Sequence, residues 1–247
     1  MKYKTATLSE AGGREENQDY CGLTGKGEFN CWVLADGLGG HRGGAVAARL
    51  AVETFLEVFS QNPEMSPRSM TAYIEAAQDA IFRRQEENPR LYSMRTTLVA
   101  LISTPEGALW AHLGDSRLYH FRGGGIIFQT RDHSVPQAMA DAGKITVDEI
   151  RRHEDRNRLL CALGNEKNLR PAVEKKSHPV NPDDAFLLCT DGFWEYVVET
   201  EMIADLVRSP DPETWLDMMT TRIKERTEDR HDNYSAIAII AGEPTLT

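Results

Sequence analysis

Five aspartates stand at the ends of apolar segments that the residue pattern predicts as β-strands. They are Asp36 in WVLADG, Asp191 in AFLLCTDG, Asp115 in LWAHLGDSR, Asp232 in RHDNYSAIAII and Asp19 in REENQDYCGLT. An unpaired buried carboxylate is costly, and clustered carboxylates raise one another's pKa. If the five side chains meet in the fold, they require a compensating positive charge.

Divalent cations are the compensating charge that these residue types favour. Hard oxygen ligands without His or Cys pairs select Mg²⁺, Mn²⁺ or Ca²⁺. Two such ions about 3.5–4 Å apart, bridged by a carboxylate, form a clamp for in-line displacement at phosphorus and make a bridging water nucleophilic near neutral pH. Arg14, in GGREENQD, has the planar guanidinium that binds phosphate oxygens. The pattern therefore indicates hydrolysis of a phosphate ester.

Each aspartate taken singly also has a purely structural interpretation. Asp-Gly, as in Asp36-Gly37, is a favoured hairpin dipeptide, and Asp commonly occupies turns and caps. Chain order alone leaves open whether the five side chains converge in space.

Composition excludes several classes of function. The chain has 247 residues and a formal net charge of −10, which argues against nucleic acid or an anionic membrane as the main partner. Four cysteines occur without a CxxC pair, and we expect buried inert thiols; they are Cys21, Cys31, Cys161 and Cys189. Neither an apolar signal core nor a run of about 18 apolar residues occurs, so we expect a cytoplasmic protein.

Strands and helices come in blocks, which favours an α+β fold with antiparallel sheets. Predicted strands cover residues 3–9, 19–24, 29–35, 172–180, 185–192 and 233–242, and a four-strand meander covers 96–103, 107–115, 116–122 and 125–130. Predicted helices cover residues 44–59, 67–87, 200–207 and 211–227.

The segment from Arg131 to Arg158 is rich in charge and poor in apolar residues. It is predicted to be a mobile flap, and Thr146 with Glu149 forms a capping-box pattern at a short helix within it. The whole chain, residues 1–247, is interpreted as one domain with a flap subdomain at about 131–165. A solvated insertion without a role is the alternative.

Several motifs in order resemble the bacterial form of the metal-dependent serine/threonine protein phosphatases, the PPM or type-2C family. The motifs are GGREENQDY, VLADGLGGHRGG, TTLVAL, HLGDSRLY, TRDHSVPQAMADAGKIT, LLCTDGFWEYV and HDNYSAIAI. The resemblance covers nearly the whole chain. It implies a four-layer α-β-β-α sandwich of two antiparallel sheets flanked by helix pairs, with the metals at one end.

The resemblance also implies a role for each acidic residue. Asp36 would bridge two tightly bound Mn²⁺ or Mg²⁺ ions, and the Gly37 carbonyl would bind one of them. Asp191 and Asp232 would hold the other ion, and Asp19 would act through a bound water. The close approach of the backbone to the metals would explain the glycines around Asp36.

Two further roles follow from the same resemblance. Asp115, together with Asp191, would form a third and weaker cation site. Arg14 would bind the substrate phosphate, so the expected catalytic residues are Arg14, Asp36 and Asp191.

Some positions depart from the family pattern. Leu38 stands where eukaryotic members carry a histidine proposed as the general acid, and His41 lies further along. We therefore expect metal-bound water to protonate the leaving alkoxide. Gln18 replaces a common glutamate, and Cys161 stands where an arginine is expected in the flap.

Two residues near these motifs are expected to be structural. His133, in RDHS, is predicted to bond backbone or carboxylate groups, as histidines around metal sites often do. Trp194 is predicted to pack near the rim of the site.

The leading interpretation is a phosphatase that acts on phosphoserine and phosphothreonine by direct attack of a metal-bridging water, without a phosphoenzyme. Its expected partners are phosphorylated proteins, the substrates of a bacterial Ser/Thr kinase that it opposes, and it is expected to act as a monomer. One alternative is a catalytically inactive, phosphatase-like signalling or binding module. The other is a two-metal phosphodiesterase or nuclease, which the net charge opposes.

Overall fold

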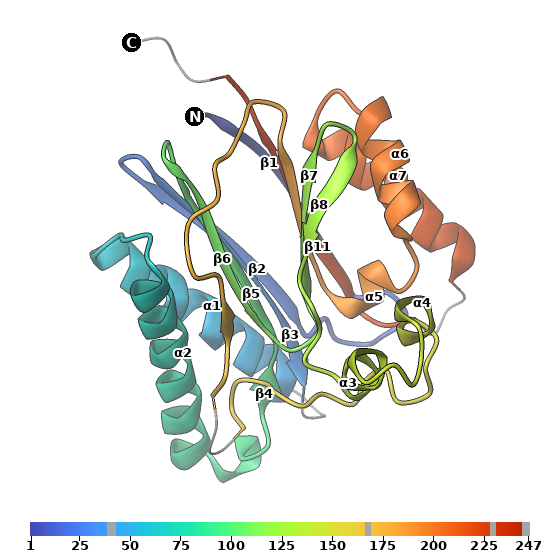
Figure 1. The fold of residues 1–247 in the computed structure, drawn as a ribbon. Helices are drawn as coiled ribbons and strands as arrows, with labels where there is room; N and C mark the ends of the chain where they lie inside the picture. Colours follow the sequence, from blue (N-terminus) through green and yellow to red (C-terminus); the bar gives the residue numbers. More distant parts are fainter. Residues whose placement is uncertain (39–42, 166–168, 228–230, 244–247) are drawn as a thin grey trace.

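Two antiparallel β-sheets lie face to face, and helices cover the outer face of each (Figure 1). A computed structural model describes residues 1–38, 43–165, 169–227 and 231–243. This is the predicted four-layer α-β-β-α arrangement, and the prediction of an α+β sandwich is confirmed.

Each sheet joins strands from distant parts of the chain. The first sheet contains, in spatial order, β1 (Tyr3–Glu10), β11 (Tyr234–Ala241), β10 (Ala185–Cys189), β7 (Arg117–Arg122) and β8 (Gly125–Gln129). The second contains β2 (Asp19–Lys26), β3 (Phe29–Leu38), β5 (Leu98–Thr104), β6 (Gly107–Leu113) and β9 (Ala172–Val173), with β4 (Arg95–Thr96) paired to β3.

The two helix pairs are amphipathic and cover opposite sheets. The pair over the second sheet is α1 (Gly43–Gln61) and α2 (Pro67–Glu87), which the short 3₁₀ helix η1 (Pro89–Leu91) follows. The pair over the first sheet is α6 (Glu199–Arg208) and α7 (Pro212–Arg226). Side chains cap two of these helices, since the Ser66 hydroxyl accepts from Ser69 N–H and the Asp211 carboxylate accepts from Thr214 N–H.

Strand β3 shows why its sequence is continuously apolar. Trp32 and Leu34 face the other sheet, whereas Cys31, Val33 and Ala35 face helix α1. A strand that is covered on both sides has no solvent face, so the usual alternation of apolar and polar residues is lost.

The predicted four-strand meander is wrong. Strands β5 and β6 pair in one sheet, but β7 and β8 pair in the other. The chain crosses between the sheets at residues 114–116, where Gly114 has φ +98°. Apolar runs with short turns are compatible with either arrangement, because β5, β6 and β7 are buried on both faces.

The strand predicted over residues 172–180 is also largely wrong. Only Ala172 and Val173 form β9, and a single further bridge joins His178 to Ala108. The segment lies at the sheet edge, contains exposed Lys175 and Lys176, and includes Pro179, which has no N–H to donate.

The predicted flap contains two short helices, α3 (Val135–Asp141) and α4 (Val147–Ile150). As expected for the α4 start, the Glu149 carboxylate accepts a hydrogen bond from Thr146 N–H at 2.7 Å. Ion pairs tie the flap to the domain, from Arg151 to Glu199 at 2.9 Å and from Arg156 to Glu195.

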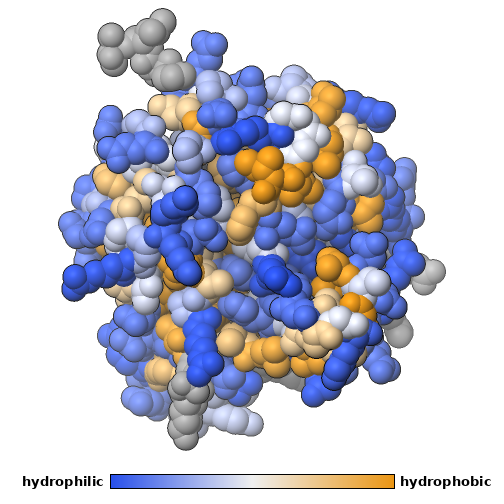
Figure 2. Space-filling view, viewed as in Figure 1, coloured by the Kyte–Doolittle hydropathy of each residue, from blue (hydrophilic) through white to orange (hydrophobic). Residues whose placement is uncertain are grey.

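The face of the molecule seen in Figure 1 is mainly hydrophilic, with hydrophobic residues in separate groups (Figure 2). Within the described part of the chain, no helix has the length and apolar character needed to cross a membrane.

Candidate metal centre

The fold brings the five aspartates to the same end of the sandwich, although they are far apart in sequence. Asp19 begins β2 and stands directly opposite Asp36 in the ladder of β2 and β3. Asp191 follows β10 and begins the one-turn helix α5 (Asp191–Trp194), and Asp232 lies two residues before β11. Like charges placed opposite each other in a ladder are destabilising, so this pairing points to a function other than stability.

These carboxyl groups perturb one another. Asp19 and Asp115 are buried, whereas Asp36, Asp191 and Asp232 are partly exposed. Burial raises the pKa of Asp19 to about 7, and repulsion from Asp191 and Asp232 adds to that rise. Burial and neighbouring carboxylates likewise raise the pKa of Asp36, Asp115 and Asp191.

The donor set fits a hard divalent cation, although the side chains do not already form a cage. Among the described residues, no three His, Cys, Asp or Glu side chains are arranged as a ready metal site. The Asp19 Oδ1 atom is nevertheless buried without a hydrogen-bond partner, and repulsion from Asp191 contributes to the raised pKa of Asp36. A bound cation would provide a partner for the Asp19 oxygen and offset the repulsion between the carboxylates.

The glycines of both Asp-Gly pairs are required by close backbone approach. A Cβ on Gly37 would lie 2.2 Å from the Gly44 carbonyl oxygen, and one on Gly192 would lie 2.1 Å from the Asn233 carbonyl oxygen. Gly37 lies within strand β3, so the hairpin-turn interpretation of Asp36-Gly37 is wrong. The glycine instead lets the start of helix α1 pack against the strand end that carries Asp36.

Arg14 lies at the mouth of the site. Its guanidinium donates to Asp232 Oδ2 at 2.9 Å, and 56% of its side chain is exposed. A cleft of about 390 Å³ adjoins it, and the lining residues are Arg14, Glu16, Gln18, Asp36, Gly37, Asp232 and Asn233. The predicted phosphate ligand and three of the predicted metal ligands, Asp36, Gly37 and Asp232, thus share one cleft.

Asn233 was not predicted to act in the site, yet it holds the segment that carries Arg14. Its Nδ2 atom donates to the carbonyls of Ala11 and Glu16, at 2.8 and 3.0 Å, and its Oδ1 atom accepts from Gln18 N–H at 2.9 Å. Its position next to Asp232 in the HDN motif was the available sequence signal.

Threonines that had no predicted role also fix the strand ends. The Thr97 hydroxyl accepts from Asp36 N–H at 2.9 Å, and the Thr96 hydroxyl donates to the Asp36 carbonyl at 2.8 Å. The Thr190 hydroxyl donates to Asp19 Oδ2 at 3.0 Å. These bonds lock the main chain of Asp36 and one carboxylate oxygen of Asp19.

The family departures occupy different surroundings. Leu38 ends strand β3 and is partly buried, and His41 lies outside the described residues. Gln18 contacts the site through its backbone, since its carbonyl accepts from Gly37 N–H at 3.1 Å. Cys161 is partly buried in the flap.

His133 makes a backbone hydrogen bond as predicted, and Trp194 is a packing residue as predicted but is buried in the core and not exposed at the rim. His133 Nδ1 accepts from Gly114 N–H at 3.3 Å, and its ring stacks on His112 at 4.7 Å between centroids. Trp194 is 2% exposed and packs in the core beneath α6 and α7.

Comparisons with known proteins agree with this geometry. A model of the protein phosphatase 2C family matches residues 9–232. The serine/threonine phosphatase stp of Listeria welshimeri is 31% identical over 202 residues, which cover 79% of each chain.

Solved structures extend the similarity. The catalytic domain of PstP, a serine/threonine protein phosphatase of Mycobacterium tuberculosis, was solved with two manganese ions; it is 25% identical with a TM-score of 0.80, and the match covers 98% of this chain and 99% of that one. PppA, described as a regulatory component of the type VI secretion system in Pseudomonas aeruginosa, is 29% identical with a TM-score of 0.76, over 98% of both chains. The chain belongs to the protein phosphatase 2C family.

Proposed function

We propose that this protein hydrolyses phosphoserine and phosphothreonine in proteins, with Mn²⁺ or Mg²⁺ as cofactor. The observation that carries the proposal is the meeting of five aspartates at one end of the sandwich, beside an exposed arginine and a cleft of about 390 Å³. Asp36, Asp191 and Asp232 with the Gly37 carbonyl would hold two ions, Asp19 would act through water, and Asp115 would serve a third, weaker site.

The side chains of this protein have distinct tasks in that reaction. Bound cations supply the charge that activates water and neutralises phosphoryl oxygens. Arg14 would exchange its exposed partner Asp232 for a phosphate oxygen of the substrate, a change of partner that costs little because surface ion pairs are weak. Thr96 and Thr97 hold the main chain of Asp36 rigid, so its carboxylate needs little reorganisation.

The cysteines argue against a phosphoenzyme formed on a thiol, which is consistent with the proposed direct attack of water on phosphorus. Burial raises the pKa of three thiols, those of Cys21, Cys31 and Cys189. A thiol held in its neutral form is a poor nucleophile. Cys161 belongs to the flap and does not line the cleft beside Arg14.

The substrate class follows from charge and from the relatives. A net charge of −10 disfavours polyanionic nucleic acids, whereas a single phosphorylated side chain needs one local arginine. The curated relatives are named serine/threonine phosphatases. We further propose that the protein opposes a Ser/Thr kinase and that it acts as a monomer in the cytoplasm.

A phosphopeptide assay tests the proposal. The protein is treated with EDTA, dialysed, and assayed with and without Mn²⁺ on phosphoserine and phosphothreonine peptides and on single-stranded DNA. We expect peptide turnover only with the cation, no DNA cleavage, and a loss of several orders of magnitude in Asp36→Asn, as for other positioned electrostatic groups. Cation binding without turnover would indicate an inactive binding module, and full turnover in excess chelator would refute the metal mechanism.

A further inference from the structure

The main chain at Asp115 lies outside the ladders of both sheets. Here the chain passes from β6 to β7 through Gly114, whose φ is +98° and where a Cβ would lie 2.6 Å from the Thr97 side chain. Side chains of other segments hold this crossing, including His133 at Gly114 and the Thr97 hydroxyl, which is 2.7 Å from that of Ser116. The position of the Asp115 carboxylate therefore depends on contacts with other parts of the fold.

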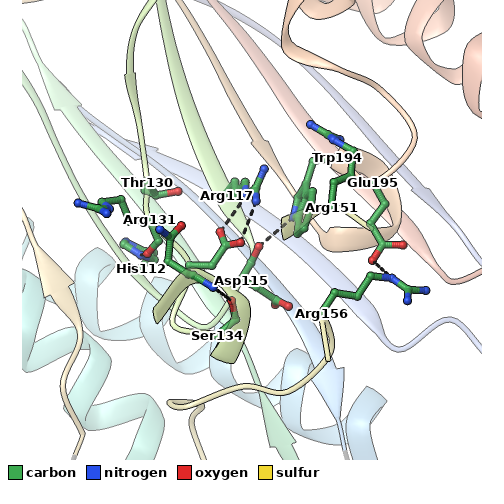
Figure 3. A network of polar contacts seen from close by, with 12 residues as sticks. His112, Asp115, Arg117, Thr130, Arg131, Ser134, Arg151, Arg156, Trp194 and Glu195 are labelled. Atoms are coloured by element: carbon green, nitrogen blue, oxygen red, sulfur yellow. Dashed lines mark hydrogen bonds and ion pairs between the residues drawn. The ribbon is translucent and has the colours of Figure 1, made fainter. Parts of the chain in front are cut away.

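Trp194 makes the contact with Asp115 itself. Its indole N–H donates to the Asp115 carbonyl oxygen at 2.9 Å (Figure 3). Trp194 is the last residue of helix α5, and Asp191 is the first. One side chain thus connects the helix that carries Asp191 to the main chain of Asp115.

The same indole ring also contacts the flap. The Arg117 guanidinium lies 3.5 Å from the ring centroid and makes two hydrogen bonds, each 2.8 Å long, to Asp132 at the start of the flap. Arg151, which follows α4, lies 5.5 Å from the centroid of the ring (Figure 3). It also pairs with Glu199. Cation–π contacts are strengthened by burial, and Arg117 is 4% exposed.

We propose that Trp194 is a positioning residue that fixes the spacing between Asp115 and Asp191 and couples this spacing to the flap. The inference rests on the proposed function, in which both aspartates hold cations. Movement of Arg151 or Asp132 with the flap would shift the indole, and the indole N–H would carry that shift to the Asp115 main chain. Trp194 would touch neither substrate nor reacting atoms.

Trp215 provides a matched control. It is also fully buried, lies in the same core cluster, and donates its indole N–H to a main-chain carbonyl, that of Met202, at 3.0 Å. That carbonyl belongs to helix α6 and not to an aspartate of the site. Phenylalanine at either position removes one donor and keeps most of the buried ring.

The experiment compares Trp194→Phe and Trp215→Phe by calorimetric titration with Mn²⁺ and by phosphopeptide kinetics at limiting and saturating Mn²⁺. For Trp194→Phe we expect the Kd of the weakest Mn²⁺ binding step to rise about threefold to tenfold, as for one lost hydrogen bond. Turnover should fall at limiting Mn²⁺ and recover at saturating Mn²⁺, with KM for the peptide unchanged. Trp215→Phe should lose comparable stability in urea and keep the Mn²⁺ affinity of the wild type.

Equal Mn²⁺ affinities in the two variants, or a loss of turnover in Trp194→Phe that excess Mn²⁺ leaves uncorrected, would overturn the positioning role. A wild-type protein without Mn²⁺-dependent turnover would instead refute the proposed function, which separates the two failures.

The flap connection has its own pair of variants. Arg151→Gln removes the flap cation from the Trp194 ring, whereas Arg131→Gln removes an exposed flap arginine that pairs with Asp141 within the flap. We expect the weakest Mn²⁺ step to weaken in Arg151→Gln and to stay unchanged in Arg131→Gln. If neither variant changes it, the coupling to the flap is refuted.

Discussion

Replacing Asp19 with Asn should change how the stability of the chelator-treated protein depends on pH. Burial, with repulsion from Asp191 and Asp232, raises the pKa of Asp19 from 3.8 to about 7. In the unfolded chain the same carboxyl ionises near its ordinary value of 3.8. The folded state therefore binds this proton more tightly than the unfolded state does. Well below the unfolded pKa, Asp19 is protonated in both states and its ionisation does not affect the free energy of unfolding. As the pH rises from the unfolded pKa to the folded pKa, ionisation lowers the free energy of unfolding progressively.

The magnitude follows from the size of the shift. A tenfold change in proton affinity corresponds to about 1.4 kcal/mol. Ionisation of Asp19 therefore lowers the free energy of unfolding by about 2 kcal/mol at pH 5 and by about 4 kcal/mol at pH 8. Buried His112 acts in the opposite direction, because burial lowers its pKa to about 4 and it favours folding more as the pH rises. His112 is common to both proteins, so its contribution cancels in the difference between Asp19→Asn and the wild type.

Urea unfolding in EDTA between about pH 5 and pH 8 measures this difference. Asn keeps an oxygen for the Thr190 hydroxyl, which donates to Asp19 at 3.0 Å. Between pH 5 and pH 8, the free energy of unfolding of the variant should rise by about 2 kcal/mol relative to that of the wild type, which is the difference between the two values given above. Mn²⁺ at neutral pH should then stabilise the wild type more than the variant. A difference that stays constant or shrinks as the pH rises would refute the assignment of a costly buried carboxylate to Asp19.

Three further substitutions test individual roles. Arg14→Ala should weaken phosphate binding by roughly 1.5–3 kcal/mol. It should leave cation affinity nearly unchanged, because the ion pair of Arg14 with Asp232 is exposed. Loss of cation binding in calorimetry would show that Arg14 is not simply a phosphate ligand. Asp191→Ala should lose the tightly bound pair of ions, whereas Asp115→Ala should keep the pair and lose most turnover on phosphopeptides; a metal titration giving the reverse order would contradict the assignment. Asn233→Asp removes two hydrogen bonds donated to the segment that carries Arg14. KM should therefore rise more than kcat falls, and amide hydrogen exchange in that segment should become faster. Unchanged exchange would contradict the role of Asn233 in holding the segment.

The sequence determined the local structure and the kind of chemistry. Apolar runs that end in Asp predicted the strands on which Asp36 and Asp191 depend, and the Asp211-Pro212 pair predicted the start of α7. Such signals are local, because they reflect hydrogen bonds and side-chain periodicity within a few residues. The carboxylate-rich composition of the motifs likewise indicated hard cations before any geometry was known.

The tertiary structure decided how these segments meet. The pattern could not show that β6 and β7 belong to different sheets, since a strand buried on both faces reads the same in either. It also did not reveal the contacts of Asn233 with residues 11–18 or of Trp194 with Asp115, which join segments about 80 or more residues apart. Such hydrogen bonds depend on how the two sheets and the flap pack together, and no local spacing encodes them.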